Sequence, residues 1–322
     1  MKRMQGTGVA VHSLLALEIA LEMTSSSEPN PYIDTLPKHA DFAATTPLMW
    51  PAQLQNLLPR PTQKIVAQQQ TAINNDFKKI LTKFPDLSKD VFTHSWLLVN
   101  SRTFNYEPSE LQHVPDGQIA MVPIADLINH AEEGCTVTFS RTEYIITADR
   151  KYKQGEEIQF CYGTQHSNDG LLGEYGFILA RNQWDMVSLD EVILPRLNAK
   201  QKADLGGQDR MGRFTLDFLG GLSGRTRKAI RLLARGEGEE VGYESDDEER
   251  FNELVAEVLD AFADVVSKTL AKLEKLDKVG LASQRKILRR RWMQIGTIVE
   301  KARENLEDIG KPAQPNRPPW IE

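Results

Sequence analysis

The stretch PIADLINHAEEGC (123–135) sets an aspartate, an apolar pair and an adjacent asparagine and histidine directly ahead of a segment with strand character. Apolar and polar residues alternate in CTVTFS (135–140), and EYIITA (143–148) and EEIQFCYG (156–163) follow after short turns. Such a pattern predicts a compact region of short antiparallel strands. An Asn-His pair by itself is more often part of a turn, so its role depends on the surrounding motifs.

Helical patterns flank this strand region on both sides. Residues 11–23 are apolar nearly all round and predict a mostly buried helix, and the patterns at 63–83 and 91–104 predict two more. In the last third, residues 251–273 and 284–306 each carry one apolar stripe. These two amphipathic helices are expected to pack as an antiparallel pair.

Shorter segments complete the predicted organisation. SNDGLLGEYGF (167–177) has Asn168 as an N-cap for a short helix. The acidic run 236–250 is expected to be a solvated loop, and the basic run RKILRRR (285–291) is expected to be the solvated face of a helix, with contact to an acidic partner as the competing interpretation.

Composition narrows the class of protein. The chain has 322 residues and a formal net charge of −6, which argues against broad binding to nucleic acid and favours a basic protein partner. No apolar run is long enough for a membrane span, and acidic residues inside the N-terminal apolar segment are unlike a signal peptide. Two cysteines, Cys135 and Cys161, build neither a disulfide framework nor a cysteine-rich zinc cluster, so we expect an intracellular protein without a structural metal.

Three motifs, PIADLINHAEEGC (123–135), GEEIQFCYG (155–163) and SNDGLLGEYGF (167–177), together resemble the SET-domain protein lysine methyltransferases. More narrowly, they look like the branch of the Rubisco large-subunit and ribosomal-protein lysine methyltransferases, which spaces two pocket tyrosines as Tyr162 and Tyr175 are spaced here. YIDTLP (32–37) and SRTF (101–104) look like pieces of the helical insert that splits the SET fold of that branch.

The resemblance implies an α+β fold: a SET-type β fold of short strands with a helical insert, followed by an all-helical C-terminal substrate-binding domain. The implied domains are the helical insert at 1–110, the C-terminal part of the SET core at 111–182, the helical domain at 183–310 and a disordered tail at 311–322. The N-terminal strands of the family, with their Gly-x-Gly turn, are expected to be missing, because Gly6-Thr7-Gly8 runs straight into the predicted helix at 11–23.

The same resemblance implies roles for individual residues. Tyr162 would be the catalytic tyrosine, near both the methyl group of S-adenosylmethionine and the substrate amine. Asn129 and His130 would contact the cofactor. Tyr175 would line the lysine channel with Phe177 as a wall, although core packing is the competing interpretation for both rings.

For two further side chains, Asp126 and Arg102, both a functional and a structural role fit the sequence. Asp126 would meet the substrate or orient the backbone, and a loop-capping aspartate is the equal alternative. Arg102 would face a carboxylate of the cofactor or substrate, with a surface ion pair as the alternative.

The expected function is transfer of a methyl group from S-adenosylmethionine to a lysine of a basic protein, with a ribosomal protein as one candidate. The alternative is a non-catalytic protein-binding module derived from such an enzyme. The cytoplasm is the expected location, with the nucleus as a second one.

Overall fold

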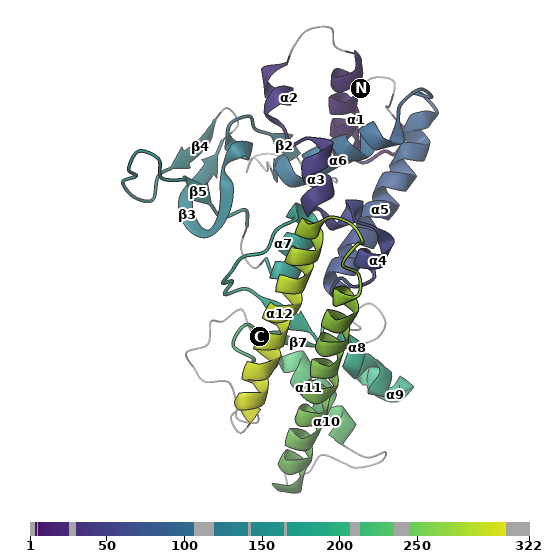
Figure 1. The fold of residues 1–322 in the computed structure, drawn as a ribbon, viewed down its shortest axis with the longest axis vertical. Helices are drawn as coiled ribbons and strands as arrows, with labels where there is room; N and C mark the ends of the chain where they lie inside the picture. The colour runs from purple at the N-terminus through teal and green to yellow at the C-terminus, as the bar shows by residue number, and fades with distance from the viewer. Residues whose placement is uncertain are drawn as a thin grey trace. The chain divides into compact units, whose positions relative to one another are not determined.

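The computed structural model describes residues 4, 6–25, 30–105, 119–140, 143–163, 166–206, 213–234 and 245–306. The chain divides into two compact units, shown with their elements in Figure 1. The first comprises Met1–Met49, Lys64–Thr164 and Leu172–Gly176, and the second comprises Trp50–Gln63, Gln165–Leu171 and Phe177–Glu322. The predicted domain boundaries remain predictions, and the predicted disordered tail at 311–322 lies outside the described residues.

The helices of the first unit begin with α1 (Val11–Ser25), which packs against α6 (Lys89–Arg102). Both were expected from apolar patterning, and α5 (Arg60–Leu81) confirms the third predicted helix of this third of the chain. The proline-rich stretch between them folds into α2 (Pro31–Thr35), α3 (His39–Thr45) and the 3-10 turn η2 (Pro47–Met49). Asn30 caps α2, because its side chain accepts a hydrogen bond from the backbone N–H of Tyr32 at 3.1 Å.

The strands of the first unit form two small sheets. Strands β1 (Thr103–Asn105) and β2 (Ile119–Met121) pair antiparallel, as do β3 (Asn129–Phe139) and β4 (Tyr144–Thr147). The short β5 (Gln159–Phe160) pairs with β3 in parallel, so the prediction of an entirely antiparallel region was wrong for this strand. The register shifts between His130 and Cys135, and in this segment a Cβ added to Gly134 would collide with the carbonyl oxygen of Gln159.

The second unit contains the predicted helical pair. Helices α11 (Ser245–Glu274) and α12 (Ala282–Glu304) run side by side, green and yellow in Figure 1. Because α11 begins at Ser245, the end of the acidic run is helical rather than a loop; residues 236–244 lie outside the described part. The other elements here are α4 (Ala52–Gln55), β6 (Met186–Ser188), α8 (Asp190–Ile193), η4 (Leu194–Arg196), α9 (Ala199–Asp204), β7 (Thr215–Asp217) and α10 (Gly224–Ala234). The C-terminal helices are therefore accompanied by a two-stranded antiparallel sheet, β6–β7.

A buried arginine ties three segments of the second unit together. Arg291 on α12 is fully buried; its Nε donates to Asp169 Oδ1 at 2.7 Å, and its Nη1 donates to Asp185 Oδ2 at 2.6 Å. Burial raises the pKa of the Asp169 carboxyl, while the guanidinium opposes that shift. Arg291 was expected on a solvated helix face, and that expectation was wrong because its charge has carboxylate partners distant in sequence. Asp169 belongs to α7 (Asn168–Tyr175), the predicted short helix.

No helix among the described residues has both the length and the apolar character needed to cross a membrane.

The imidazole of His12 on α1, whose two ring nitrogens are buried, predicts a pH dependence of stability. Its ring lies 4.3 Å from the Trp96 ring, and neither ring nitrogen has a hydrogen-bond partner among the described residues. Burial lowers the pKa of His12 from its ordinary 6.5 to about 4, against the opposing charge of Asp76. The imidazole therefore binds a proton more tightly in the unfolded chain than in the folded one. The stability that the neutral imidazole contributes is complete above pH 6.5 and is lost as the pH falls towards 4.

We therefore expect His12→Phe to reduce the loss of stability between about pH 7 and about pH 4.5 by roughly 2 kcal/mol, measured by urea unfolding at both pH values. His39, which is exposed, provides the matched control, because His39→Phe replaces an imidazole at the surface by the same side chain. An unchanged pH dependence in His12→Phe would contradict the assignment.

Candidate functional site

A strained turn presents the first site residue. Ile124 has φ 75° and ψ −48°, a conformation that β-branched residues rarely adopt, and its side chain is 77% exposed. Directly after it, the 3-10 turn η3 (Ala125–Leu127) buries Asp126. The turn thus directs the aspartate inward and leaves an isoleucine in contact with solvent.

Asp126 joins two helices of the first unit. Its carboxylate is 0% exposed, accepts a hydrogen bond from the Tyr32 hydroxyl at 2.7 Å and lies 3.5 Å from Nη1 of Arg102. The same guanidinium nitrogen donates to the backbone carbonyl of Asp126 at 2.5 Å. Burial, followed by the hydrogen bond to Asp126, raises the pKa of Tyr32. Arg102 is therefore in an ion pair within the chain, as the second alternative expected, but its partner carboxylate is buried; its contact with a carboxylate of the cofactor or substrate stays a prediction.

This cluster retains unused hydrogen-bonding capacity within the described part of the chain. Asp126 Oδ1 and Arg102 Nε are both buried, and neither has a hydrogen-bond partner there. A buried polar atom without a partner costs about 1–3 kcal/mol. One of these atoms accepts a hydrogen bond and the other donates one, so the pair suits a group that offers both a donor and an acceptor.

His130 positions the backbone of Tyr162. The imidazole Nδ1 accepts a hydrogen bond from the backbone N–H of Tyr162 at 3.0 Å, and the two ring centroids are 5.1 Å apart. His130 is on β3, while Tyr162 lies two residues beyond β5, so the parallel pairing of these strands brings the two together. The imidazole of His130 thus acts on Tyr162, and its predicted contact with a cofactor stays a prediction.

The hydroxyl of Tyr162 is held by a hydrogen bond to the backbone. It donates to the backbone carbonyl of Ile128 at 2.9 Å, and the Tyr162 ring lies 5.2 Å from the ring of Tyr175. Burial is the main cause that raises the pKa of both phenols, that of Tyr175 to about 12. Both phenols are therefore protonated at neutral pH, and the pair of tyrosines expected from their spacing is brought together.

The remaining predicted residues lie elsewhere. Asn129 is exposed, and its side-chain amide donates to Glu157 Oε1 at 2.6 Å. Phe177 belongs to the second compact unit, whereas Tyr175 belongs to the first. The sequence does not single out Tyr32, although YIDTLP (32–37) resembles part of the helical insert of the SET fold. It does not single out Ile128 either, because that residue contributes a backbone carbonyl, which no side-chain pattern reveals.

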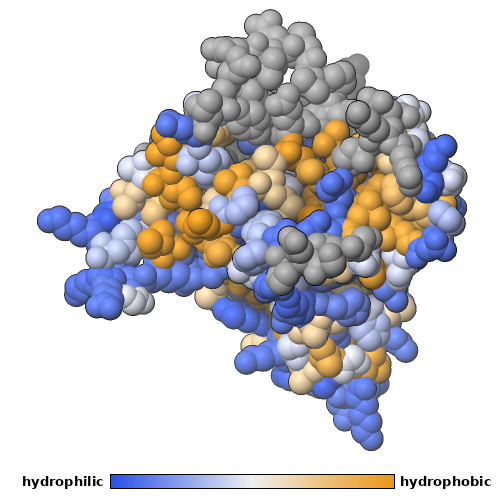
Figure 2. All heavy atoms as spheres, turned by 90° about the horizontal axis from the view of Figure 1, so that it is seen from above, coloured by the Kyte–Doolittle hydropathy of each residue, from blue (hydrophilic) through white to orange (hydrophobic). Residues whose placement is uncertain are grey.

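The sheet that carries the site exposes apolar side chains. Phe139 and Ile145 are exposed, and the register pairs Ile145 with Thr138, so they lie on opposite faces of the β3–β4 hairpin. Figure 2 shows orange apolar side chains at the surface of one face of the molecule, between blue polar ones. Neither face of the hairpin is fully covered by the residues that the structure describes.

The hydrogen bond between Tyr32 and Asp126 can be isolated by a double-mutant cycle. We expect Tyr32→Phe and Asp126→Asn each to lower the free energy of unfolding, with a coupling energy of about 1.5–3 kcal/mol because the acceptor is charged. Urea titration measures all four proteins. Tyr144→Phe is the control, since no described residue bonds the Tyr144 hydroxyl; additive effects of Tyr32→Phe and Asp126→Asn would contradict the bond.

The strain at Ile124 makes a separate prediction. Glycine tolerates positive φ and alanine does not, so Ile124→Gly should be more stable than Ile124→Ala by about 1 kcal/mol in urea unfolding. At Leu127, which is exposed but has ordinary backbone angles, the same pair of substitutions should rank in the opposite order. Equal ranking at both positions would rule out strain at Ile124.

Comparison with known proteins relates part of the chain to a family. The family model of the SET domain matches residues 11–163. The mouse "SET domain-containing protein 4" is 29% identical over 170 residues, covering 47% of this chain and 37% of that protein. The yeast (Saccharomyces cerevisiae) "Ribosomal lysine N-methyltransferase 2" is 28% identical over 130 residues, covering 35% of this chain and 27% of that protein. The chain thus matches less than two fifths of the length of either curated relative.

Solved structures confirm the fold over most of the chain. The SET domain of LSMT bound to lysine and AdoHcy has a TM-score of 0.56 at 18% identity, covering 92% of this chain and 76% of that one. Rubisco LSMT bound to AdoMet gives 0.56 at 19% identity with the same coverage. With the motifs at 123–177, these matches support the resemblance found in the sequence: residues 11–163 match the SET domain, and the chain has the fold of Rubisco LSMT.

Proposed function

We propose that this chain is a protein-lysine N-methyltransferase that uses S-adenosylmethionine. The observation that carries the proposal is the fixed Tyr162 hydroxyl, directed at the Ile128 carbonyl beside the Tyr175 ring. Methyl transfer between bound partners depends mainly on alignment, and the Tyr162 phenol oxygen and the Ile128 carbonyl oxygen each keep a lone pair that can accept a hydrogen bond from an amine. The relatives support this function: one is named as a ribosomal lysine methyltransferase, and two related structures hold AdoMet or AdoHcy.

The residues present suit S-adenosylmethionine chemically. Its amino-acid end carries an ammonium and a carboxylate, which match the acceptor Asp126 Oδ1 and the donor Arg102 Nε, neither of which has a hydrogen-bond partner among the described residues. The exposed amide of Asn129 and the backbone around His130 are the further groups that would hold it. When bound, this cofactor supplies an electrophilic methyl group on a sulfonium.

The protein's own task is to receive a neutral amine. Lysine has an ordinary pKa of about 10.4 and arrives as an ammonium. The desolvation that raises the pKa of Tyr162 and of Tyr175 disfavours charge, so the same surroundings lower the pKa of an entering ammonium. The Tyr162 hydroxyl and the Ile128 carbonyl then orient the amine, which needs no strong base to lose its proton.

A basic protein is the proposed substrate class. The net charge of −6 favours such a partner, and the similarity to a yeast ribosomal lysine methyltransferase makes ribosomal proteins the first class to test. For a ribosomal substrate, the cytoplasm is the proposed site of action, and the nucleus is the second.

The decisive experiment is methyl transfer from radiolabelled S-adenosylmethionine by the purified chain to ribosomal proteins. We expect Tyr162→Phe to lower the rate by about 100-fold, since it removes a hydroxyl that orients the reacting groups. Tyr144→Phe removes a hydroxyl from the neighbouring hairpin and should keep the full rate. No transfer by a folded chain to any lysate protein would refute the enzymatic proposal and leave the non-catalytic binding module.

Calorimetric titration with S-adenosylmethionine separates binding from turnover. Binding that weakens in Asn129→Ala would support the assignment of the cofactor site. If Asn129→Ala binds S-adenosylmethionine as the wild type does, Asn129 is not part of the cofactor site. The role proposed for Tyr162 would be unaffected by that result.

A further inference from the structure

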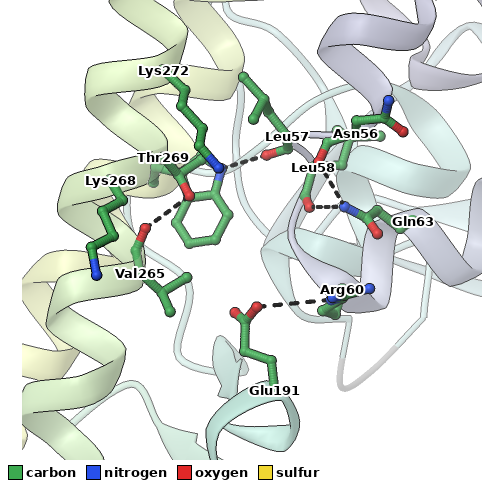
Figure 3. Close-up of a pocket in the computed structure, with 11 residues that line it drawn as sticks. Asn56, Leu57, Leu58, Arg60, Gln63, Glu191, Val265, Lys268, Thr269 and Lys272 are labelled. Carbon is green, nitrogen blue, oxygen red and sulfur yellow. Dashed lines mark hydrogen bonds and ion pairs between the residues drawn. The ribbon is translucent and has the colours of Figure 1, made fainter.

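A pocket of about 440 Å³ lies within the second unit and is lined by none of the residues discussed above as the site (Figure 3). One wall is α11, another is the connection from α4 into α5, and α8 contributes Glu191. The volume is in the range of ordinary ligand sites. The lining residues used below are Leu57, Arg60, Glu191, Val265, Lys268, Lys272 and Trp292.

The wall of this pocket is basic, although the chain is acidic overall. The described residues that line it include three basic side chains, Arg60, Lys268 and Lys272, and one carboxylate, Glu191, whose Oε2 is 3.8 Å from Arg60 Nε. Lys268 has a long and exposed ion pair with Asp264, at 3.5 Å, which contributes little. Lys272 has no acidic partner among the described residues. Positive charge is thus left over in the pocket and is available to an anionic ligand.

The spacing of the two lysines suits an extended chain. They are four residues apart on α11, which sets them on one face with a rise of about 6 Å. Side chains on one side of an extended peptide repeat at about 6.6 Å. Carboxylates at alternate positions of such a peptide would therefore meet Lys268 and Lys272 together.

The floor of the pocket is apolar and held in place. Trp292 is buried, and its indole N–H donates to the Leu57 carbonyl at 2.7 Å, as Figure 3 shows. Val265 lies one turn before Thr269 on the same wall. A peptide whose other side chains are small and apolar could pack on this floor, whereas a basic peptide would meet the two lysines.

We propose that this pocket is a docking site for an acidic, extended peptide segment of a partner protein. The site does not depend on methyl transfer, and its test uses no cofactor, so the two proposals stand or fall separately. The pocket would bind an acidic segment, whereas the proposed catalytic site binds a basic lysine. The docked segment is therefore a part of the partner other than the methylated lysine, or belongs to another partner.

The test is fluorescence anisotropy of the full chain with a labelled peptide of alternating glutamate and alanine, at low salt. We expect binding that falls with added salt, and a loss of about tenfold in the double variant Lys268→Gln/Lys272→Gln, because two exposed charge interactions with the peptide are removed. Lys278→Gln is the matched control on a lysine that does not line the pocket, and it should bind as the wild type does.

A second variant acts in the opposite direction. Glu191→Gln removes the one carboxylate of the wall, so it should tighten binding a few-fold, which a merely damaged fold would not do. Equal binding of an alternating glutamine and alanine peptide would overturn the proposal, as would equal weakening in Lys278→Gln. Competition by inorganic phosphate well beyond that by chloride at matched ionic strength would show a phosphate site instead.

Discussion

The buried carboxylate of Asp126 is the constraint on which the site depends. A fully buried charge requires both an opposite charge and hydrogen bonds, and here these come from α6 through Arg102 and from α2 through Tyr32. Because Asp126 is held from two sides, the chain that follows it, with the Ile128 carbonyl and the start of β3, is held as well. The strained angles of Ile124 show that this placement outweighs the local preference of the backbone.

The placement of Asp126 also determines the position of Tyr162, through His130 and Ile128. His130 is four residues beyond Asp126 and bonds the backbone of Tyr162, while the Tyr162 hydroxyl returns to the Ile128 carbonyl. The tyrosine is thus fixed at its backbone and at its hydroxyl by two groups, the His130 imidazole and the Ile128 carbonyl, that are two residues apart in the chain. A side chain held at both ends loses little further freedom on binding, which is the property that alignment of a methyl donor and an amine requires.

Helices and motif residues could be predicted from the sequence, because periodicity and motif order encode them. Contacts between residues that are distant in the sequence could not be predicted. The long helices follow from apolar stripes, and Tyr162 and Tyr175 follow from three motifs in order. The parallel pairing of β5 was not foreseen, because a two-residue strand has no pattern that states its direction. Arg291 looked like one more exposed charge in a basic run, because its partners Asp169 and Asp185 are more than a hundred residues away. Tyr32 was unassigned for the same reason.

Arg291 also bears on the pocket in the second unit. Trp292 follows it directly on α12, and adjacent helical residues point about 100° apart, so one helix turn directs a guanidinium into an ion-paired core and an indole onto the pocket floor. Two short charge-assisted bonds fix the rotation of that turn, and the bond from Trp292 to Leu57 fixes the ring itself. The floor is therefore set by buried interactions that a ligand does not alter. Selection among ligands is left to the exposed lysines at the rim, whose charges act without rearranging the fold.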